Sequence, residues 1–334
     1  MPEKAMWADV SVVGIPRSLL YYRYGVLWTT FFTALGRQVV VSEPTDKAIA
    51  DRGEHLSVDE CCLASKVFMG HVDSLIDRCD AVFVPSYPTA EHRTGFCTKF
   101  QSVTDIAKNT FRDQHLEVIS CEVGNVRKVR DVRRPFEEMA IRMGASRKEA
   151  HSAFKAAFAA QAAHDKVLAD AQERTLRQIV AKRRAAQTNP NADPGLGILV
   201  VAHPYITHDA YLSGAVLDAL ADMGADVVFA DAIDHDHAYK KSFEFSDTMP
   251  WVINRELIGA ILLTEDKIDG IVLISAFPCG PDSMTDDAIM RYIQGKPILN
   301  LMIDAQSGTA GVETRVESFV DILRFQQKGG YTHG

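Results

Sequence analysis

The stretch GIVLISAFPCGPDSM, residues 270–284, runs from an unbroken apolar segment through a proline-rich turn into polar residues that often start helices. Apolar runs of this kind are typical of strands buried on both faces of a parallel sheet. The stretch therefore predicts a central strand followed by a helix, which is the repeating step of an α/β fold. Pro278 and Pro281 stiffen the turn, and Gly280 lets backbone come close to Cys279.

The same alternation of short apolar strands and helical patterns occurs in both halves of the chain. We expect strands at 10–14, 39–41, 81–85, 116–121, 198–202, 227–230, 270–274 and 297–303. We expect helices at 19–35, 69–76, 209–223, 256–264, 286–293 and 313–325. Gly36 and Gly224 stand where C-cap glycines belong. Strands that alternate with helices predict parallel βαβ units.

The middle of the chain differs from both halves. Residues 134–187 are rich in alanine, glutamine and charged residues, and apolar residues recur every three or four positions, which predicts one or two long amphipathic helices. We therefore expect an N-terminal α/β domain at 1–130, a helical connection at 131–190 and a C-terminal α/β domain at 191–334. Each α/β domain should be an open parallel sheet of the Rossmann or flavodoxin-like type, with the functional site in a cleft between the two.

Composition excludes several classes of protein. The chain has 334 residues and a net charge of -8 at pH 7, so a globally basic nucleic-acid binder is not expected. It contains no run of about 18 apolar residues of the kind that spans a membrane. Its beginning lacks the long apolar core of a signal peptide. We expect a cytoplasmic protein.

The chain contains six cysteines, which are Cys61, Cys62, Cys79, Cys97, Cys121 and Cys279. Disulfides are not expected in a long intracellular chain, which leaves metal ligation, redox chemistry or simple burial. Cys79 and Cys121 flank predicted strands, where we expect structural burial. Cys61 is next to Cys62, and one metal seldom takes two adjacent cysteines, so we expect it to be a bystander.

Three of the cysteines lie in turns where a ligand site is expected. Cys279 follows a central strand, and open α/β sheets bind ligands beyond the carboxyl ends of their strands. Asp282 or Ser283 can cap the next helix, whose free N–H groups would stabilise a thiolate or a cluster sulfide. Cys97 follows another strand, and Cys62 precedes a helix. Their spacing alone fits a site assembled by tertiary structure, and it fits burial as small apolar residues equally well.

Several motifs of the chain, in order, resemble one family. They are GIPRSLLYYRYGVLWTTFFTALGRQVVVSEPT, DECCLASKVFMGHV, FCTKF, AHPYITHD, AFPCGPDS and KPILNLMIDAQSGTAGVETRVESFVDIL. Together they are similar to 2-hydroxyacyl-CoA dehydratase subunits and to proteins related to acyl-CoA dehydratase activases. The resemblance covers most of the chain outside the helical middle. It implies one [4Fe-4S] cluster per chain, held by Cys62, Cys97 and Cys279. With three thiolate ligands one iron keeps an open position, which suits Lewis-acid or one-electron chemistry.

Further residues are candidates for roles around such a cluster. The backbone N–H groups of Gly280, Asp282 and Ser283 could donate hydrogen bonds to cluster sulfur and tune its potential. The candidate catalytic residues are His71, Lys66, His208 and Ser283. A solvated surface helix is the alternative explanation for His71 and Lys66.

The sequence departs from the family pattern at one informative place. Ala305 and Gln306 stand where the resembled DEHSG pattern has Glu-His. If that pair serves substrate or proton chemistry, this chain lacks it, and dehydratase activity is in doubt. The chain also shows no matching phosphate-binding glycine motif, so ATP-driven electron injection would need an ATP-dependent activase as a separate chain.

These observations lead to competing functional hypotheses. The first is an oxygen-sensitive enzyme subunit that accepts a low-potential electron from the activase and carries out reductive or radical chemistry on a small-molecule substrate, an acyl-CoA, at the open iron. The second is a non-catalytic electron-transfer or cluster-carrying accessory protein. The third is an α/β protein without a cluster. The resemblance further implies paired subunits, either a homodimer or a complex with a related subunit.

Overall fold

The structure, a computed structural model, describes residues 6–89, 91–114, 116–189, 191–304 and 309–330. The chain divides into two compact units. Unit 1 comprises the chain up to His164 together with Thr248–Val252, and unit 2 comprises Asp165–Asp247 and the chain from Ile253 onward. Each unit is described by itself below.

Unit 1 is built on a parallel sheet of four described strands in the order β2-β1-β3-β4. The strands are β1 (Val12–Ile15), β2 (Gln38–Val41), β3 (Ala81–Phe83) and β4 (Val118–Ile119). Its helices are α1 (Tyr21–Ala34), α2 (Lys47–His55), α3 (Leu63–Asp73), α4 (Thr98–Thr110) and α5 (Val129–Arg142), with a 3-10 turn at Arg112–Gln114.

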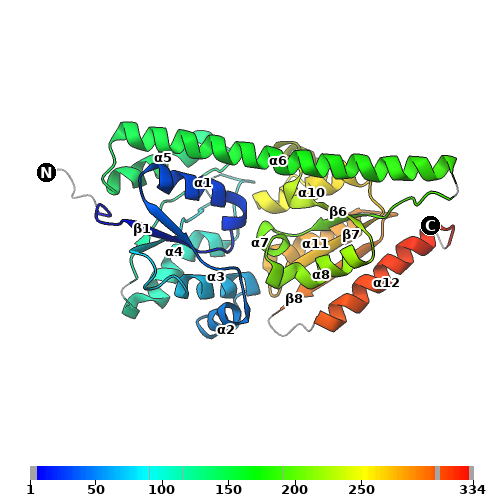
Figure 1. The fold of residues 1–334 in the computed structure, drawn as a ribbon, viewed down its shortest axis with the longest axis horizontal. Helices are drawn as coiled ribbons and strands as arrows, with labels where there is room; N and C mark the ends of the chain where they lie inside the picture. The colour runs from blue at the N-terminus through cyan, green and yellow to red at the C-terminus, as the bar shows by residue number, and fades with distance from the viewer. Residues whose placement is uncertain (1–5, 90, 115, 190, 305–308, 331–334) are drawn as a thin grey trace. The chain divides into compact units, whose positions relative to one another are not determined.

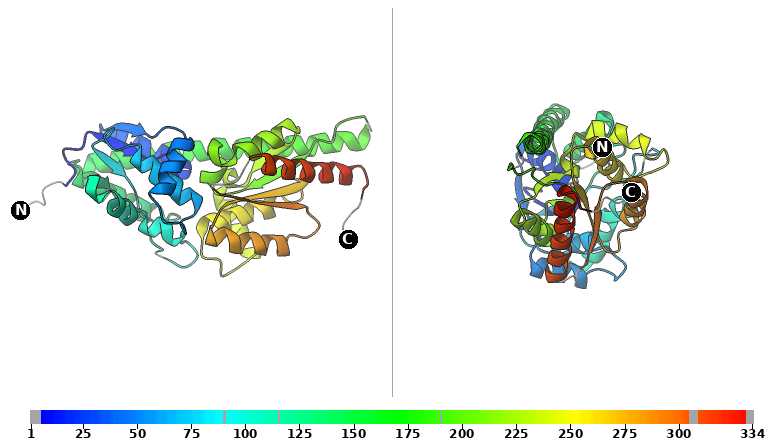
Figure 2. Two further views of the ribbon diagram at one scale, coloured as in Figure 1. Left: turned by 90° about the horizontal axis from the view of Figure 1, so that it is seen from below. Right: turned by 90° about the vertical axis from the view of Figure 1, so that its right-hand side faces the viewer.

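Unit 2 repeats this plan with a parallel sheet in the order β6-β5-β7-β8. The strands are β5 (Gly197–Val201), β6 (Asp226–Phe229), β7 (Gly270–Ala276) and β8 (Ile298–Ile303). The helices are α7 (Pro204–Thr207), α8 (Ala210–Asp222), α9 (His235–Lys241), α10 (Val252–Thr264), α11 (Gly280–Tyr292) and α12 (Thr309–Gln327), with 3-10 turns at Ala230–Ala232 and Ser242–Glu244. Every residue of the central strand β7 is buried, and α12 lies beside α8 within this unit (Figures 1 and 2).

Both sheets therefore have the same topology, and the prediction of two open parallel-sheet α/β domains is confirmed. In each unit the chain first moves from a central strand to one edge, then crosses back to the other side. The order of strands thus reverses between β1 and β3 in unit 1, and between β5 and β7 in unit 2. In open α/β sheets ligands bind beyond the carboxyl ends of the strands at this reversal.

The same pair of hydrogen bonds, made by an aspartate, occurs at the amino end of both sheets. Asp80 directly precedes β3; its backbone N–H donates to Val12 O at 2.9 Å, and its carboxylate accepts from Val12 N at 2.8 Å. Asp269 directly precedes β7; its N–H donates to Gly197 O, and its carboxylate accepts from Gly197 N, both at 2.7 Å. The same bonds join the first and third strands of each unit, so the two units share detail as well as topology.

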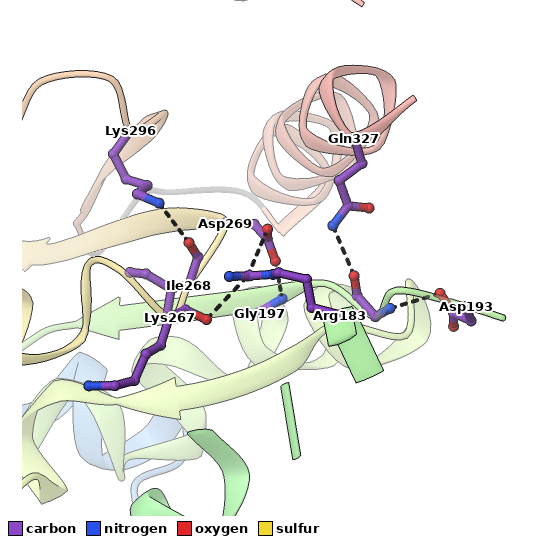
Figure 3. A network of polar contacts seen from close by, with 9 residues as sticks. Arg183, Asp193, Gly197, Lys267, Ile268, Asp269, Lys296 and Gln327 are labelled. Carbon is purple, nitrogen blue, oxygen red and sulfur yellow. Dashed lines mark hydrogen bonds and ion pairs between the residues drawn. The ribbon is translucent and has the colours of Figure 1, made fainter. Parts of the chain in front are cut away.

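Polar contacts around Asp269 and Gly195 join helices α6 (Arg147–Thr188) and α12 to the amino end of the unit 2 sheet (Figure 3). Arg183 donates to Asp269 Oδ1 at 2.9 Å and to Lys267 O at 3.2 Å. Gln327, at the end of α12, donates to Gly195 O at 2.9 Å. These contacts lie at the amino ends of the strands, opposite the carboxyl ends beyond which open α/β sheets bind ligands.

The predicted helical middle contains one very long helix, α6 (Arg147–Thr188, 42 residues), which contributes to both units (Figure 1). In unit 1 the Gln161 amide accepts from Leu27 N at 2.9 Å and donates to Arg23 O at 3.1 Å. The Gln161 amide thus lies between Leu27 N and Arg23 O, which are the donor and the acceptor of one i→i−4 hydrogen bond in a regular helix. In unit 2 Gln172 accepts from Phe229 N, at the end of the edge strand β6, at 2.9 Å. Each glutamine satisfies a backbone donor of the unit on which it lies.

Helices α2 and α3 pack closely because glycines face their contact. A Cβ added to Gly70 would lie 2.0 Å from Ile49 O, and one added to Gly53 would lie 2.0 Å from Lys66 O. Real Cβ atoms do not approach backbone oxygen so closely, so this packing requires glycine at both positions. In the described part of the chain, no helix combines the length and apolar character needed to cross a bilayer.

Helix starts are the main differences from the sequence prediction. Helix α3 begins at Leu63 rather than residue 69, and α11 begins at Gly280 rather than residue 286. Helices α2, α4 and α9 were not predicted. The prediction relied on apolar periodicity, and the first turns of α4 and α11 contain mostly small or polar residues that give no hydrophobic stripe.

Candidate functional site

The three cysteines of the predicted cluster occupy one structural position on three different helices. Cys62, Cys97 and Cys279 are the N-cap residues of α3, α4 and α11, and all three have extended backbone angles. At an N-cap, the N–H groups of the first turn carry the positive end of the helix dipole and stabilise a thiolate. Each of the three residues is half-buried, and none of the six cysteines forms a disulfide.

Cys97 and Cys279 also occupy equivalent places in the repeated topology. Helix α4 follows β3, the third strand of unit 1, and α11 follows β7, the third strand of unit 2. Cys62 caps the helix that precedes β3. The corresponding helix of unit 2 is α10, whose first turn carries Asn254 and no cysteine. The repeat therefore supplies two cysteine-capped helices from unit 1 and one from unit 2.

A lysine joins the two cysteine-bearing ends within unit 1. Lys99, two residues after Cys97, donates from Nζ to the sulfur of Cys61 at 3.1 Å. Because Cys61 adjoins Cys62, this contact brings the starts of α3 and α4 together at the carboxyl edge of the sheet. It also places a positive charge between the two helix starts.

His71 and Lys66, two candidate catalytic residues, both lie on α3. His71 is fully buried, with Nδ1 2.9 Å from Ser42 Oγ and Nε2 2.9 Å from Thr45 Oγ1. Burial, together with the positive charge of Arg17, lowers its pKa to about 4, so the imidazole is neutral at pH 7. Lys66 places Nζ 3.9 Å from Glu54, and its side chain is 12% exposed. Both residues make specific contacts rather than forming a solvated helix face.

A small pocket lies at the strand reversal of unit 1, beside the helix that starts at Cys97. Most of its lining is apolar: Pro16, Leu19, Leu20, Trp28, Phe68, Phe83, Val84, Pro85, Phe100 and Val103, together with Ser18 and Tyr87. Phe100 and Val103 belong to α4, so the same helix presents Cys97 and part of this pocket. The position is the one at which open α/β sheets bind ligands.

In unit 2, Cys279 itself caps α11. The expectation that Asp282 or Ser283 caps this helix is therefore wrong, because the helix begins at Gly280. Ser283 donates from its backbone N and from Oγ to Cys279 O, at 3.1 and 2.7 Å. A Cβ added to Gly280 would meet nothing within 4 Å, so the space beside this residue is open. Asp282 points inward and is 5% exposed.

The carboxylate of Asp282 is the centre of a buried polar array. It accepts from Asn254 Nδ2 at 3.0 Å, lies 3.2 Å from His203 Nδ1, and accepts a hydrogen bond from the Cys279 side chain. Burial by itself would raise the pKa of Asp282, but the charge of His203 holds it below the usual value. Burial and the neighbouring Asp282 raise the pKa of Asp286 to about 7. The array borders a small pocket at the reversal between β5 and β7.

Asn254 and Asp286 were not found from the sequence. Both stand inside helices, at positions where a polar residue looks like part of a solvated face. The sequence does contain a signal for Asp286: it lies four residues after Asp282, and this helical spacing places the two carboxylates on the same face. Nothing local marks Asn254, whose partners lie 28 and 31 residues further along the chain.

His208 forms a second, separate pair in unit 2. Its Nε2 lies 2.7 Å from Asp231 Oδ2, and its side chain is 34% exposed. Burial opposes the charged imidazolium, but the hydrogen bond with Asp231 raises the pKa of His208 overall. Asp231 follows β6 and is buried; the sequence analysis missed it because it lies 23 residues from its partner.

Cys79 and Cys121 have the surroundings of structural thiols. Cys79 Sγ donates to Leu75 O at 3.3 Å, and burial raises its pKa to about 11. Cys121 is buried at the end of the unit 1 sheet, and burial raises its pKa further still. Neither thiol would ionise readily at neutral pH.

Among the residues that the structure describes, no group of three or more His, Cys, Asp or Glu side chains is placed to hold a metal ion. Cys62 and Cys97 belong to unit 1 and Cys279 to unit 2. The three-cysteine site therefore stays a prediction, which the thiol donors and their helix caps fit chemically. Ala305 and Gln306, at the departure from the family pattern, lie outside the described residues.

Comparison with known proteins gives distant structures and one family. A crystal structure of a sugar transporter from Clostridium phytofermentans is 11% identical, covering 97% of this chain and 95% of that chain, with a TM-score of 0.21. The C-terminal domain of glucosamine-fructose-6-phosphate aminotransferase from Francisella tularensis is 10% identical, covering 96% and 86%, with a TM-score of 0.24. At such scores the likeness carries no argument. No curated protein matches the chain.

The family match agrees with the motifs and with the fold. The family described as CoA enzyme activase uncharacterised domain (DUF2229) matches residues 12–233. This range contains the whole unit 1 sheet, with Cys62 and Cys97, and the first two strands of unit 2. The chain therefore belongs to the family of the CoA enzyme activase uncharacterised domain, which relates it to the activation of CoA enzymes.

Proposed function

We propose that this chain is a [4Fe-4S] protein that works with an ATP-dependent activase. It would accept a low-potential electron from that separate chain and use it for reductive chemistry on a small-molecule substrate, with an acyl-CoA as the substrate class. The cluster ligands would be Cys62, Cys97 and Cys279. When bound, the cluster would supply one-electron and Lewis-acid chemistry at an iron without a cysteine ligand.

One observation carries the proposal. All three cysteines cap the N-termini of helices, and Cys97 and Cys279 do so at equivalent positions of a repeated fold. Burial by itself would place cysteines on apolar faces, as it does for Cys121. A shared cap position would instead let the N–H groups of a helix N-terminus face each thiolate. Membership of a family related to CoA enzyme activation supports the link to an activase.

The other residues of the two units have roles that follow from their contacts. Lys99 would offset the negative charge of thiolates at the start of α4. The apolar pocket beside α4 would take an apolar part of the substrate and exclude water from it. In unit 2, Asp286 lies beside Asp282, and with a pKa of about 7 it would hold or release a proton close to neutral pH.

A second candidate function is a non-catalytic electron-transfer or cluster-carrying accessory protein. Two observations favour it: Ala305 and Gln306 replace the Glu-His of the resembled pattern, and the family description refers to enzyme activation. The same three cysteines would then serve storage or passage of an electron. Steady turnover of an acyl-CoA in the presence of an activase and a reductant separates the two candidates.

The proposal is tested by anaerobic purification with iron and sulfide analysis and EPR spectroscopy. Wild type should carry about four irons per chain. C62A, C97A and C279A should each lose most of the iron and the EPR signal, because each removes a ligand. The matched control is C79A, which removes a thiol that donates a hydrogen bond to Leu75 O. This variant should keep its iron.

Two outcomes would overturn the proposal. Iron-free wild type, after anaerobic reconstitution has also failed, excludes both cluster functions. Equal loss of iron in C79A and in the three ligand variants would mean that iron binding depends on folding in general and not on these cysteines.

A further inference from the structure

Asp282 ties Cys279 to two other elements of unit 2. Asp282 is 5% exposed, and its carboxylate is contacted by Asn254 on α10, His203 after β5, and the Cys279 side chain. A carboxylate this deeply buried is costly unless polar partners surround it. The three contacts therefore fix Asp282, and through it the direction of the Cys279 side chain.

Asn254 is the partner that joins two helices. It is 3% exposed, and its amide nitrogen donates to Asp282 Oδ1 at 3.0 Å and to Thr285 Oγ1 at 3.1 Å. An amide has two N–H donors, so both are used. Because Asp282 and Thr285 stand one turn apart on α11, a single side chain holds the first turn of that helix against α10.

The chain just before Asn254 makes a different contact, inside unit 1. Gly95 N donates to Pro250 O at 3.0 Å, and Val252 N donates to Gly95 O at 2.9 Å, which forms a parallel β-bridge. Gly95 stands two residues before Cys97. The loop that leads into Cys97 is therefore held by the segment that leaves unit 1 at Val252.

We propose that residues 250–254 form a positioning segment for both cysteine loops. Its backbone at Pro250 and Val252 holds the loop of Cys97, and its Asn254 side chain holds Asp282 and thereby Cys279. That this arrangement presents the two cysteines to a cluster rests on the proposed function. The positioning itself is a property of the cluster-free chain and can be measured there.

Two variants separate the two halves of the segment. N254L removes both donated hydrogen bonds with little change in side-chain size. V252P removes the N–H that bonds Gly95 O, and proline is tolerated there because Val252 is the first residue of α10. The control is Q172L, which removes another side-chain hydrogen bond of unit 2 at a site remote in sequence from the segment.

The readout is the rate of iodoacetamide alkylation at each cysteine of the cluster-free protein, followed by peptide mass spectrometry. N254L should raise the rate at Cys279, and V252P should raise the rate at Cys97. Each rise should be about fivefold, which corresponds to the ~1 kcal/mol that one hydrogen bond contributes. Q172L should leave both rates unchanged.

Unchanged rates in N254L and V252P, or an equal rise in Q172L, would overturn the positioning role. Iron analysis of wild type is independent of this result. A chain that binds no iron but shows the two selective rises would refute the proposed function and keep the inference.

Discussion

At the scale of single residues, the polar partners of a buried titratable group decide whether it carries charge. His71 and His203 are both buried histidines, yet their pKa values move in opposite directions. His71 is held by two hydroxyl groups, so burial prevails and its pKa falls. For His203 burial also lowers the pKa, but the charge and hydrogen bond of Asp282, with the charges of Asp286 and Asp231, together raise it overall. The difference lies in the partner, which local sequence does not reveal.

His71 should make the stability of unit 1 depend on pH in a defined window. Its pKa is about 4 in the folded chain, against an ordinary value of 6.5. The unfolded chain therefore binds a proton first as the pH falls below about 6.5, and stability is lost until about pH 4. Between pH 7 and pH 5 this should cost about 2 kcal/mol. Urea unfolding of wild type and H71N at both pH values checks it.

In H71N the titrating group is gone, so the part of the pH dependence that is due to His71 should disappear. All other groups are common to both proteins and cancel in the difference. The same loss of stability in both proteins between pH 7 and pH 5 would contradict the assignment of a neutral, buried His71.

The candidate residues were found from the sequence to different extents. Cys279 was placed correctly after a buried strand because that strand is an unbroken apolar run. His208 was found at a strand-to-helix junction, but its partner Asp231 was not, since the two are joined only by the packing of β5 beside β6. Partners remote in the chain depend on strand order, which local patterns do not specify.

At the scale of elements, α2 and α3 pack against each other backbone to backbone in unit 1. Periodicity did not predict α2, because its single apolar face is short and the rest of the helix is charged. The contact itself depends on Gly53 and Gly70, because a backbone oxygen of the other helix occupies the space that a Cβ would need at each position. A sequence search for apolar stripes overlooks such contacts, since glycine contributes no hydrophobic signal.

G70A should destabilise unit 1 by roughly 1–3 kcal/mol, because the added methyl group would have to push α2 away. The matched control is G214A in α8, where an added Cβ meets nothing within 4 Å. That variant should gain up to about 1 kcal/mol from the better helix propensity of alanine. Thermal unfolding of both proteins tests the pair. A G70A protein as stable as G214A would contradict the close crossing.

The two glutamines of α6 should have local effects confined to separate units. Q161L leaves the buried N–H of Leu27 without its side-chain acceptor, and Q172L does the same to Phe229. Each loss should cost about 1–3 kcal/mol. Hydrogen exchange should become faster at Leu27 only in Q161L and at Phe229 only in Q172L. Faster exchange at both amides in either variant would argue against separate roles.

At the scale of the whole molecule, the chain uses one βαβ plan twice. The alternation of strands and helices was sufficient to predict both parallel sheets, because strands buried on two faces leave a continuous apolar signal. The repeated bonds of Asp80 and Asp269 were not predicted, since an aspartate before a strand is common in loops. Their equivalence appears only when both sheets are seen.

The bridge between Gly95 and Trp251 has a consequence for the order in which the protein is made. A ribosome delivers Gly95 and Cys97 long before Trp251. The early part of the chain can form the first sheet during translation. Gly95, in the loop before Cys97, can form its bridge only after more than 150 further residues have been synthesised. The hydrogen bonds between Gly95 and residues 250–252 therefore form only shortly before the Cys279 segment is itself synthesised.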